Sequence, residues 1–134
     1  MAVKPTFVFP RAGLTGAREI QAALDALFAF DLAWRRLYGT AFKPLLSSHV
    51  RYAREWPRER WLTLPELYRE GVGDCEDLAA AYAAELVATG RDPGARPFVR
   101  RANTGRGYHV VVLGGNGREL DPSIALGMGA SETG

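Results

Sequence analysis

Residues 71–80 read Gly71-Val72-Gly73-Asp74-Cys75-Glu76-Asp77-Leu78-Ala79-Ala80, and they contain the only cysteine of the 134-residue chain. Two glycines precede an acidic run, and apolar residues then recur at helical spacing, as Leu78 and Tyr82 do. This pattern predicts a loop that turns into an amphipathic helix, with Gly90 as its stop. Cys75 therefore falls in the first turn of the predicted helix.

Two effects act on Cys75 in opposite directions. The first turn of a helix offers the positive end of the helix dipole, which favours a thiolate, and the Cys75 N–H there can serve as an oxyanion donor. The carboxylates of Asp74, Glu76 and Asp77 oppose a thiolate unless they cap the helix or pair with cations. We expect Asp74 and Asp77 to cap it. Position alone leaves a reactive thiol and a buried, inert one as open alternatives.

Composition narrows the class of protein. The chain is 47% hydrophobic and 24% charged, which is typical of a globular domain, and its length predicts one domain over residues 1–134. A single cysteine allows no internal disulfide. No stretch approaches the ~18 apolar residues of a membrane span, and residues 1–10 lack the apolar core of a signal peptide. We expect a cytoplasmic protein with no membrane partner.

The N-terminal half reads as helical. Residues 1–13 form an N-terminal arm or edge strand, and a helix runs from Leu14-Thr15 to Gly39. A short helix or turn is expected over 49–55, and another helix starts at Thr63 and ends at Gly71. The first long helix has an apolar face made of Ile20, Ala23, Leu24, Leu27, Phe28, Trp34 and Leu37.

From residue 95 the hydrophobic period changes to two. Strands are predicted at about 96–102, 108–113 and 118–122, separated by glycine-rich turns, and residues 123–134 read as a flexible tail. The fold class is therefore α+β, with N-terminal helices packed on a C-terminal antiparallel β-meander and the Cys75 helix against one face of the sheet.

A cysteine nucleophile needs a base, and the base needs a third group to orient it. The chain has two histidines, His49 in an irregular segment and His109 inside the most strand-like run. A strand holds an imidazole near a helix start better than a loop does, so His109 is the predicted base. We expect His49 to be a surface or packing residue. Asp121 follows on the strand that should pair with the one bearing His109.

The register of that strand pair decides whether His109 and Asp121 meet. A two- or four-residue loop would put Asp121 on the opposite face from His109. A three-residue loop, Gly115-Asn116-Gly117 with Gly117 left-handed, puts Val111 opposite Asp121 and His109 diagonally beside it on the same face. The glycines allow this loop, and we predict this register.

These residues resemble the transglutaminase-like superfamily, and more narrowly its small cysteine peptidases from bacteria and their phages. The resemblance spans about residues 50–125 and is carried by the runs 61–67, 71–79, 108–112 and 120–122. It implies a papain-like, transglutaminase-like core in which Cys75 is the nucleophile, His109 the base and Asp121 the orienting carboxylate. We expect no cofactor.

The leading hypothesis is a cysteine-dependent hydrolase, a peptidase or amidase, or an acyl transferase that works through a thioester acyl-enzyme. Its partner would be a peptide or protein substrate, and the choice between water and an amine as acceptor stays open. The alternative is a non-catalytic structural or assembly protein, possibly of a phage particle, that contacts other subunits in the virion.

Three further interpretations are weaker. Cys75, His109 and Asp121 are possible zinc ligands, but the close paired spacing of structural zinc sites is missing and we expect no metal. Trp61 either lines a cleft beside Cys75 or belongs to the core. Residues 51–61 mix arginines with aromatics, but acidic residues and Pro57 interrupt them, so we do not expect nucleic-acid binding.

Overall fold

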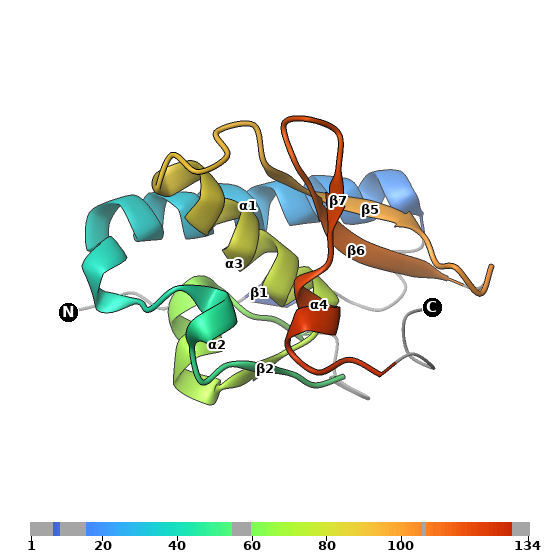
Figure 1. The fold of residues 1–134 in the computed structure, drawn as a ribbon. Coiled ribbons are helices and arrows are strands. Elements are labelled where there is room, and N and C mark those ends of the chain that lie inside the picture. Colours follow the sequence, from blue (N-terminus) through green and yellow to red (C-terminus); the bar gives the residue numbers. More distant parts are fainter. Residues whose placement is uncertain (1–6, 9–15, 55–59, 106, 130–134) are drawn as a thin grey trace.

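The computed structural model describes residues 7–8, 16–54, 60–105 and 107–129. Its longer helices and the strands of its main sheet follow the predicted order, with the three longer helices before the sheet (Figure 1), whereas several short strands and the last helix were not predicted. The helices are α1 (Ala17–Tyr38), α2 (Leu64–Glu70), α3 (Cys75–Ala88) and α4 (Pro122–Ala125), with short 3-10 turns at Gly39–Ala41 and Leu45–Ser47. The strands are β1 (Phe7–Val8), β2 (Arg51–Tyr52), β3 (Arg60–Trp61), β4 (Val72–Gly73), β5 (Arg96–Arg101), β6 (Tyr108–Leu113) and β7 (Glu119–Leu120).

The long helix α1 buries a stripe that the sequence predicts only in part. Leu24 and Leu27 are fully buried, as expected, but Leu37 is 72% exposed, so the prediction for Leu37 is wrong. The stripe continues instead through two polar residues, Asp31 and Arg35. At 100° per residue, Leu37 lies on the side of the helix opposite Arg35. The predicted start at residues 14–15 lies outside the described residues.

Buried polar contacts hold α1 to its neighbours. The Arg35 guanidinium donates to the Glu85 carboxylate of α3 over 3.0 Å, and the same carboxylate accepts from the Leu45 N–H over 2.7 Å. The Asp31 carboxylate accepts from the Leu64 N–H at the start of α2. A buried ion pair such as Arg35–Glu85 is tolerated when it is also hydrogen-bonded, whereas burial raises the pKa of Asp31 well above its ordinary value. These contacts position α2 and α3 against α1.

Two short strand pairs flank the helices. β1 pairs antiparallel with β3, which confirms an edge strand for Phe7–Val8; the rest of the predicted arm lies outside the described residues. β2 pairs in parallel with β4. The expectation of a short helix or turn over 49–55 is therefore wrong at Arg51–Tyr52, whose backbone pairs with the glycine-containing segment just before Cys75.

The main sheet is an antiparallel meander in the order β5-β6-β7. β6 pairs with β7 through Val112–Leu120 and Leu113–Glu119. The connecting loop has three residues, 115–117, and Gly117 has φ +85°. The predicted register and turn are thus confirmed. The third strand is shorter than the predicted 118–122, because the chain turns into α4 at Pro122.

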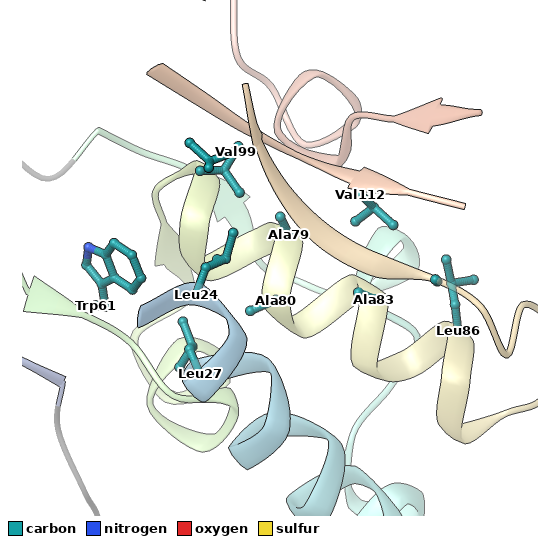
Figure 2. Packing of buried hydrophobic residues seen from close by; sticks show 11 residues of the cluster. Leu24, Leu27, Trp61, Ala79, Ala80, Ala83, Leu86, Val99 and Val112 are labelled. Carbon is teal, nitrogen blue, oxygen red and sulfur yellow. The ribbon is translucent and has the colours of Figure 1, made fainter. Parts of the chain in front are cut away.

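The main core lies between α1, α3 and one face of the sheet (Figure 2). Leu24 and Leu27 of α1 share this core with small alanines of α3 and with strand residues such as Val99 and Val112, which lets the two helices and the sheet approach closely. This packing confirms an α+β fold with the Cys75 helix against the sheet. No helix among the described residues has the length and apolar character needed to cross a membrane.

A second core joins α2, α3 and the chain after the sheet. Leu126 packs with Leu45, Val50, Leu67 and other leucines of this cluster, and Ser123 and Met128 are also buried. The expectation of a flexible tail from residue 123 is therefore wrong for residues 123–129. The apolar residues in this segment are few, but Leu126 and Met128, which follow α4, are buried, whereas Ile124 is exposed.

Gly73 provides a test of how tightly the segment before Cys75 is packed. A Cβ at this position would overlap Leu67 Cδ1 and lie 3.1 Å from Asp77 Cβ. We expect Gly73→Ala to lower the free energy of unfolding by about 1–3 kcal/mol, because the buried Leu67 and Asp77 side chains must shift. Urea denaturation measures this loss.

Gly39→Ala is the matched control. Gly39 has a helical φ of −56°, and the nearest atom to its Cβ would be Arg35 Cδ at 3.9 Å, an ordinary contact. We expect this variant to be no less stable than the wild type. Equal stabilities for the two variants would contradict the packing described around Gly73.

Candidate active site

The carboxylate of Asp74 begins helix α3 and sets the position of Cys75. Asp74 is the N-cap residue, and its Oδ1 accepts a hydrogen bond from the Cys75 N–H over 2.7 Å. Asp77 completes the cap, since its Oδ2 accepts from the Asp74 N–H over 3.0 Å. The prediction that Asp74 and Asp77 are helix-start carboxylates is confirmed.

Asp77 also makes a tertiary contact that the sequence does not reveal. Its side chain is fully buried, and its Oδ1 accepts from the Leu62 N–H over 2.7 Å. One carboxylate therefore ties the first turn of α3 to the segment that follows β3. This bond spans fifteen residues, so no local pattern indicates it.

His109 and Asp121 meet as the predicted register requires. The His109 Nε2 lies 2.8 Å from Asp121 Oδ2, and the two side chains are 5% and 14% exposed. Asp121 is in turn the N-cap of α4, where its Oδ1 accepts from the Ser123 and Ile124 N–H groups. Each carboxylate oxygen thus has its own partner, which fixes the orientation of the imidazole.

The environment of Asp121 favours its ionised form. Burial alone would raise its pKa, but the hydrogen bond and charge of His109 lower it, and the Ser123 and Ile124 N–H groups add to this effect. The net result is a pKa below the ordinary value of an aspartate. Asp121 is therefore suited to stabilising a protonated imidazole.

Cys75 packs against the core cluster that includes Val110, the residue after His109 on β6. In an antiparallel ladder, alternate residues direct their N–H groups to the same neighbouring strand. Gly114 donates to Arg118 on the β7 side, so Val110 directs its N–H to that side as well. Opposite Val110 the chain has already turned at Pro122 into α4, and the Val110 N–H lowers the pKa of the Cys75 thiol.

The thiol of Cys75 is held in its neutral form. Burial raises its pKa well above the ordinary value, and the nearby charges of Glu76 and Asp74 raise it further, whereas the Val110 N–H lowers it. The thiol donates to Glu76 Oε2 over 3.3 Å. The helix-start position alone would favour a thiolate, so here the acidic neighbours and burial outweigh it.

The structure thus joins two of the three predicted residues directly. His109 and Asp121 are bonded to each other, and Cys75 packs against the core cluster that includes Val110, the residue after His109. Within the described part of the chain, the thiol and the imidazole share no hydrogen bond. The expectation that the Cys75 N–H serves as an oxyanion donor is corrected, because this N–H already donates to Asp74.

Two other residues named from the sequence have structural roles. Trp61 is 4% exposed and belongs to the main core (Figure 2), which confirms the core role rather than the cleft role predicted as its alternative. Cys75 packs against the same core. His49 is exposed, and its Nε2 lies 2.7 Å from the Tyr68 carbonyl oxygen. This confirms the expectation of a surface or packing role for His49.

The described residues offer one group of metal-ligand atoms, on Asp74, Cys75 and Glu76, within 4.8 Å of one another. These ligand types come from consecutive residues at a helix start, and both carboxylates already accept hydrogen bonds from Cys75. The predicted zinc alternative used a different set, with His109 and Asp121, which are bonded to each other. We assign no metal to either group.

The lowered pKa of Asp121 predicts how stability changes in acid. A carboxylate with a depressed folded-state pKa contributes stability that is present above its unfolded pKa of about 3.9 and is lost as the pH falls through the folded value. We expect Asp121→Asn to lose less stability than the wild type between about pH 4 and pH 2, as measured by urea denaturation at a series of pH values. Asp25→Asn, at an exposed carboxylate of α1, is the control. Parallel curves for Asp121→Asn and the wild type would contradict the His109–Asp121 interaction.

No protein-family model, curated protein or solved structure matches this chain, so its function is inferred from the geometry of its own residues.

Proposed function

We propose that this protein is a cysteine-dependent hydrolase or acyl transferase in which Cys75 is the nucleophile, His109 the base and Asp121 the residue that orients the base. The observation that carries the proposal is the 2.8 Å contact between His109 Nε2, on β6, and Asp121 Oδ2, in the chain after β7. Cys75 packs against the core on the same sheet, in the cluster that includes Val110. Because Nε2 is engaged by Asp121, Nδ1 is the ring nitrogen left to accept a proton from the thiol.

The reaction follows from these assignments. The thiol proton moves to His109 Nδ1, and the sulfur attacks the substrate carbonyl carbon, so that the C–S bond forms and the carbonyl oxygen becomes an oxyanion. The protonated imidazole, stabilised by Asp121, then gives its proton to the leaving amine as the C–N bond breaks. A thioester remains on Cys75. Water releases the acyl group in a peptidase or amidase, and an amine releases it in a transferase.

The arrangement of elements supports a papain-like, transglutaminase-like core. A helix carries the cysteine in its first turn and packs on an antiparallel meander, and the histidine and aspartate follow in that chain order on the meander. The half-buried Asp121 and the fixed imidazole are the features expected of an orienting acid and a base. A peptide or protein is the proposed substrate class.

A specific observation favours a second candidate function. The thiol donates to Glu76, and the Cys75 N–H is occupied by Asp74, so neither faces a substrate carbonyl. These contacts are compatible with a non-catalytic structural or assembly protein that retains the transglutaminase-like fold, for example within a phage particle. This candidate predicts a thiol whose reactivity does not depend on His109.

Alkylation of Cys75 by iodoacetamide separates the two candidates. If Cys75 is the nucleophile and His109 its base, the wild type should react at lower pH than His109→Ala, because His109 takes the thiol proton as the sulfur attacks, whereas in the variant the thiol must ionise unaided. We expect His109→Ala to be about a hundredfold slower at pH 7, the contribution typical of a general base. Intact mass spectrometry measures the rate, and Cys75 is the only cysteine in the chain.

His49→Ala is the matched control, because His49 is an exposed histidine bonded to the Tyr68 carbonyl. Its pH profile should follow that of the wild type. Acetylation of Cys75 by p-nitrophenyl acetate, with the same dependence on His109, would report the thioester step directly. Identical profiles for the wild type and His109→Ala would refute the catalytic assignment and favour the structural candidate.

A further inference from the structure

A cavity of about 440 Å³ lies at the opposite end of α3 from Cys75. Its lining residues come from the end of α1, the end of α3 and the chain that follows each helix, and these segments lie side by side (Figure 1). From Cys75 to Glu85 the helix runs roughly 15 Å, so the cavity is separate from the candidate active site. Its volume is within the range of roughly 300–1,000 Å³ that is typical of small-molecule sites.

The oxygen acceptors that line the cavity are already engaged. Glu85 is the lining carboxylate, and its side chain is 3% exposed. Its Oε1 accepts from Arg35 Nη2 over 3.0 Å and from the Leu45 N–H over 2.7 Å, and its Oε2 pairs with Arg91. The Thr89 hydroxyl donates to the Glu85 carbonyl over 2.8 Å and accepts from Arg91 Nε. The cavity therefore offers few acceptors to the donor groups of a ligand.

The two arginines that line the cavity have donors left over. Arg35 is 5% exposed, and its Nε–H has no hydrogen-bond partner among the described residues, which is unfavourable for a buried donor. The Arg91 side chain is 55% exposed, and within the described part of the chain its Nη1 donates to no other group. Two guanidinium charges and one carboxylate charge leave the lining with a net charge of +1. This lining favours an anionic ligand that is rich in acceptors.

The remaining lining is mostly apolar, and it narrows the class of anion. Phe42, Pro44 and Ala88 belong to it, and the Phe42 ring centroid lies 5.7 Å from the guanidinium carbon of Arg35. Apolar surface is stabilised when it is covered by another apolar group, whereas a free phosphate ion would gain nothing from covering it. A carboxylate attached to a short apolar body uses both the donors and the apolar residues.

We propose that this cavity is a binding site for a small monocarboxylate with a short apolar body. The carboxylate accepts from the planar donor group of Arg91, whose geometry matches a carboxylate. The positive charge of the buried Arg35 adds to the attraction, and the apolar body packs against Phe42, Pro44 and Ala88. The inference is independent of the proposed function, because neither Cys75 nor His109 takes part in it.

The test is a titration of the ¹⁵N-labelled protein with hexanoate at pH 7, followed through the amide chemical shifts. We expect saturable shifts at Gly39, Ala88 and Thr89, which line the cavity, and unchanged shifts at Cys75. Two probes separate the parts of the ligand. 1-Hexanol keeps the apolar body without the charge, and acetate keeps the charge on a much shorter body. Each should bind at least about tenfold more weakly than hexanoate.

Three variants locate the site. Arg91→Gln should weaken hexanoate about tenfold and leave 1-hexanol unchanged, because it removes the charge-assisted hydrogen bond alone. Ala88→Phe places a large side chain at a half-buried lining position and should abolish binding of both probes. Arg18→Gln removes an exposed arginine at the other end of α1 and is the matched control, with unchanged affinity. The dispersion of the amide spectra shows that each variant is folded.

Each outcome decides the assignment. Equal affinities of the wild type for hexanoate and 1-hexanol would overturn the carboxylate ligand, and so would shifts that do not saturate. Binding that survives in Ala88→Phe, or that weakens as much in Arg18→Gln as in Arg91→Gln, would show general attraction to surface arginines and would overturn the cavity as the site. Binding that is lost in Ala88→Phe, weakened in Arg91→Gln and retained in Arg18→Gln supports the proposal.

Discussion

The buried carboxylate of Asp77 is the contact on which the candidate site depends. Its two oxygens accept the N–H groups of Asp74 and Leu62, so one side chain both starts α3 and attaches that start to the chain after β3. A buried carboxylate is costly unless such bonds offset its lost hydration. The two hydrogen bonds of Asp77 hold Cys75, two residues earlier, at the edge of β6 that β7 leaves uncovered rather than in solvent.

The state of the thiol is decided by competing electrostatic effects of unequal size. A helix dipole contributes about 0.3–1 kcal/mol in favour of a negative charge at its start. A unit negative charge 4 Å from a thiolate opposes it by about 1 kcal/mol in water and about 4 kcal/mol at an effective dielectric constant of 20. Glu76 and Asp74 both lie within 4.8 Å of the sulfur, and the site is partly buried. The acidic neighbours and burial therefore prevail, and the thiol stays protonated.

The sheet was predictable to the level of register. Gly117 can adopt a left-handed conformation at little cost, which allows the three-residue loop, and the alternation along 108–113 then determines which residues share a face with Asp121. The pairing of His109 with Asp121 followed from these local rules. In contrast, the prediction of the buried face of α1 was partly wrong. Asp31 and Arg35 are polar, and hydrophobic periodicity assigns polar residues to the surface of a helix.

The sequence by itself determined the elements whose causes are local: the helix that starts at Cys75, its carboxylate caps, the meander, and the register that joins His109 to Asp121. Only the tertiary structure decided that Asp77 binds Leu62, that Cys75 packs against the core that includes Val110, and that Leu126 belongs to the second core. The physical reason is the range of the interactions. Caps, turns and alternation act over a few residues, whereas the environment of the thiol is set by groups that the chain brings together from β6 and α3, more than thirty residues apart in sequence.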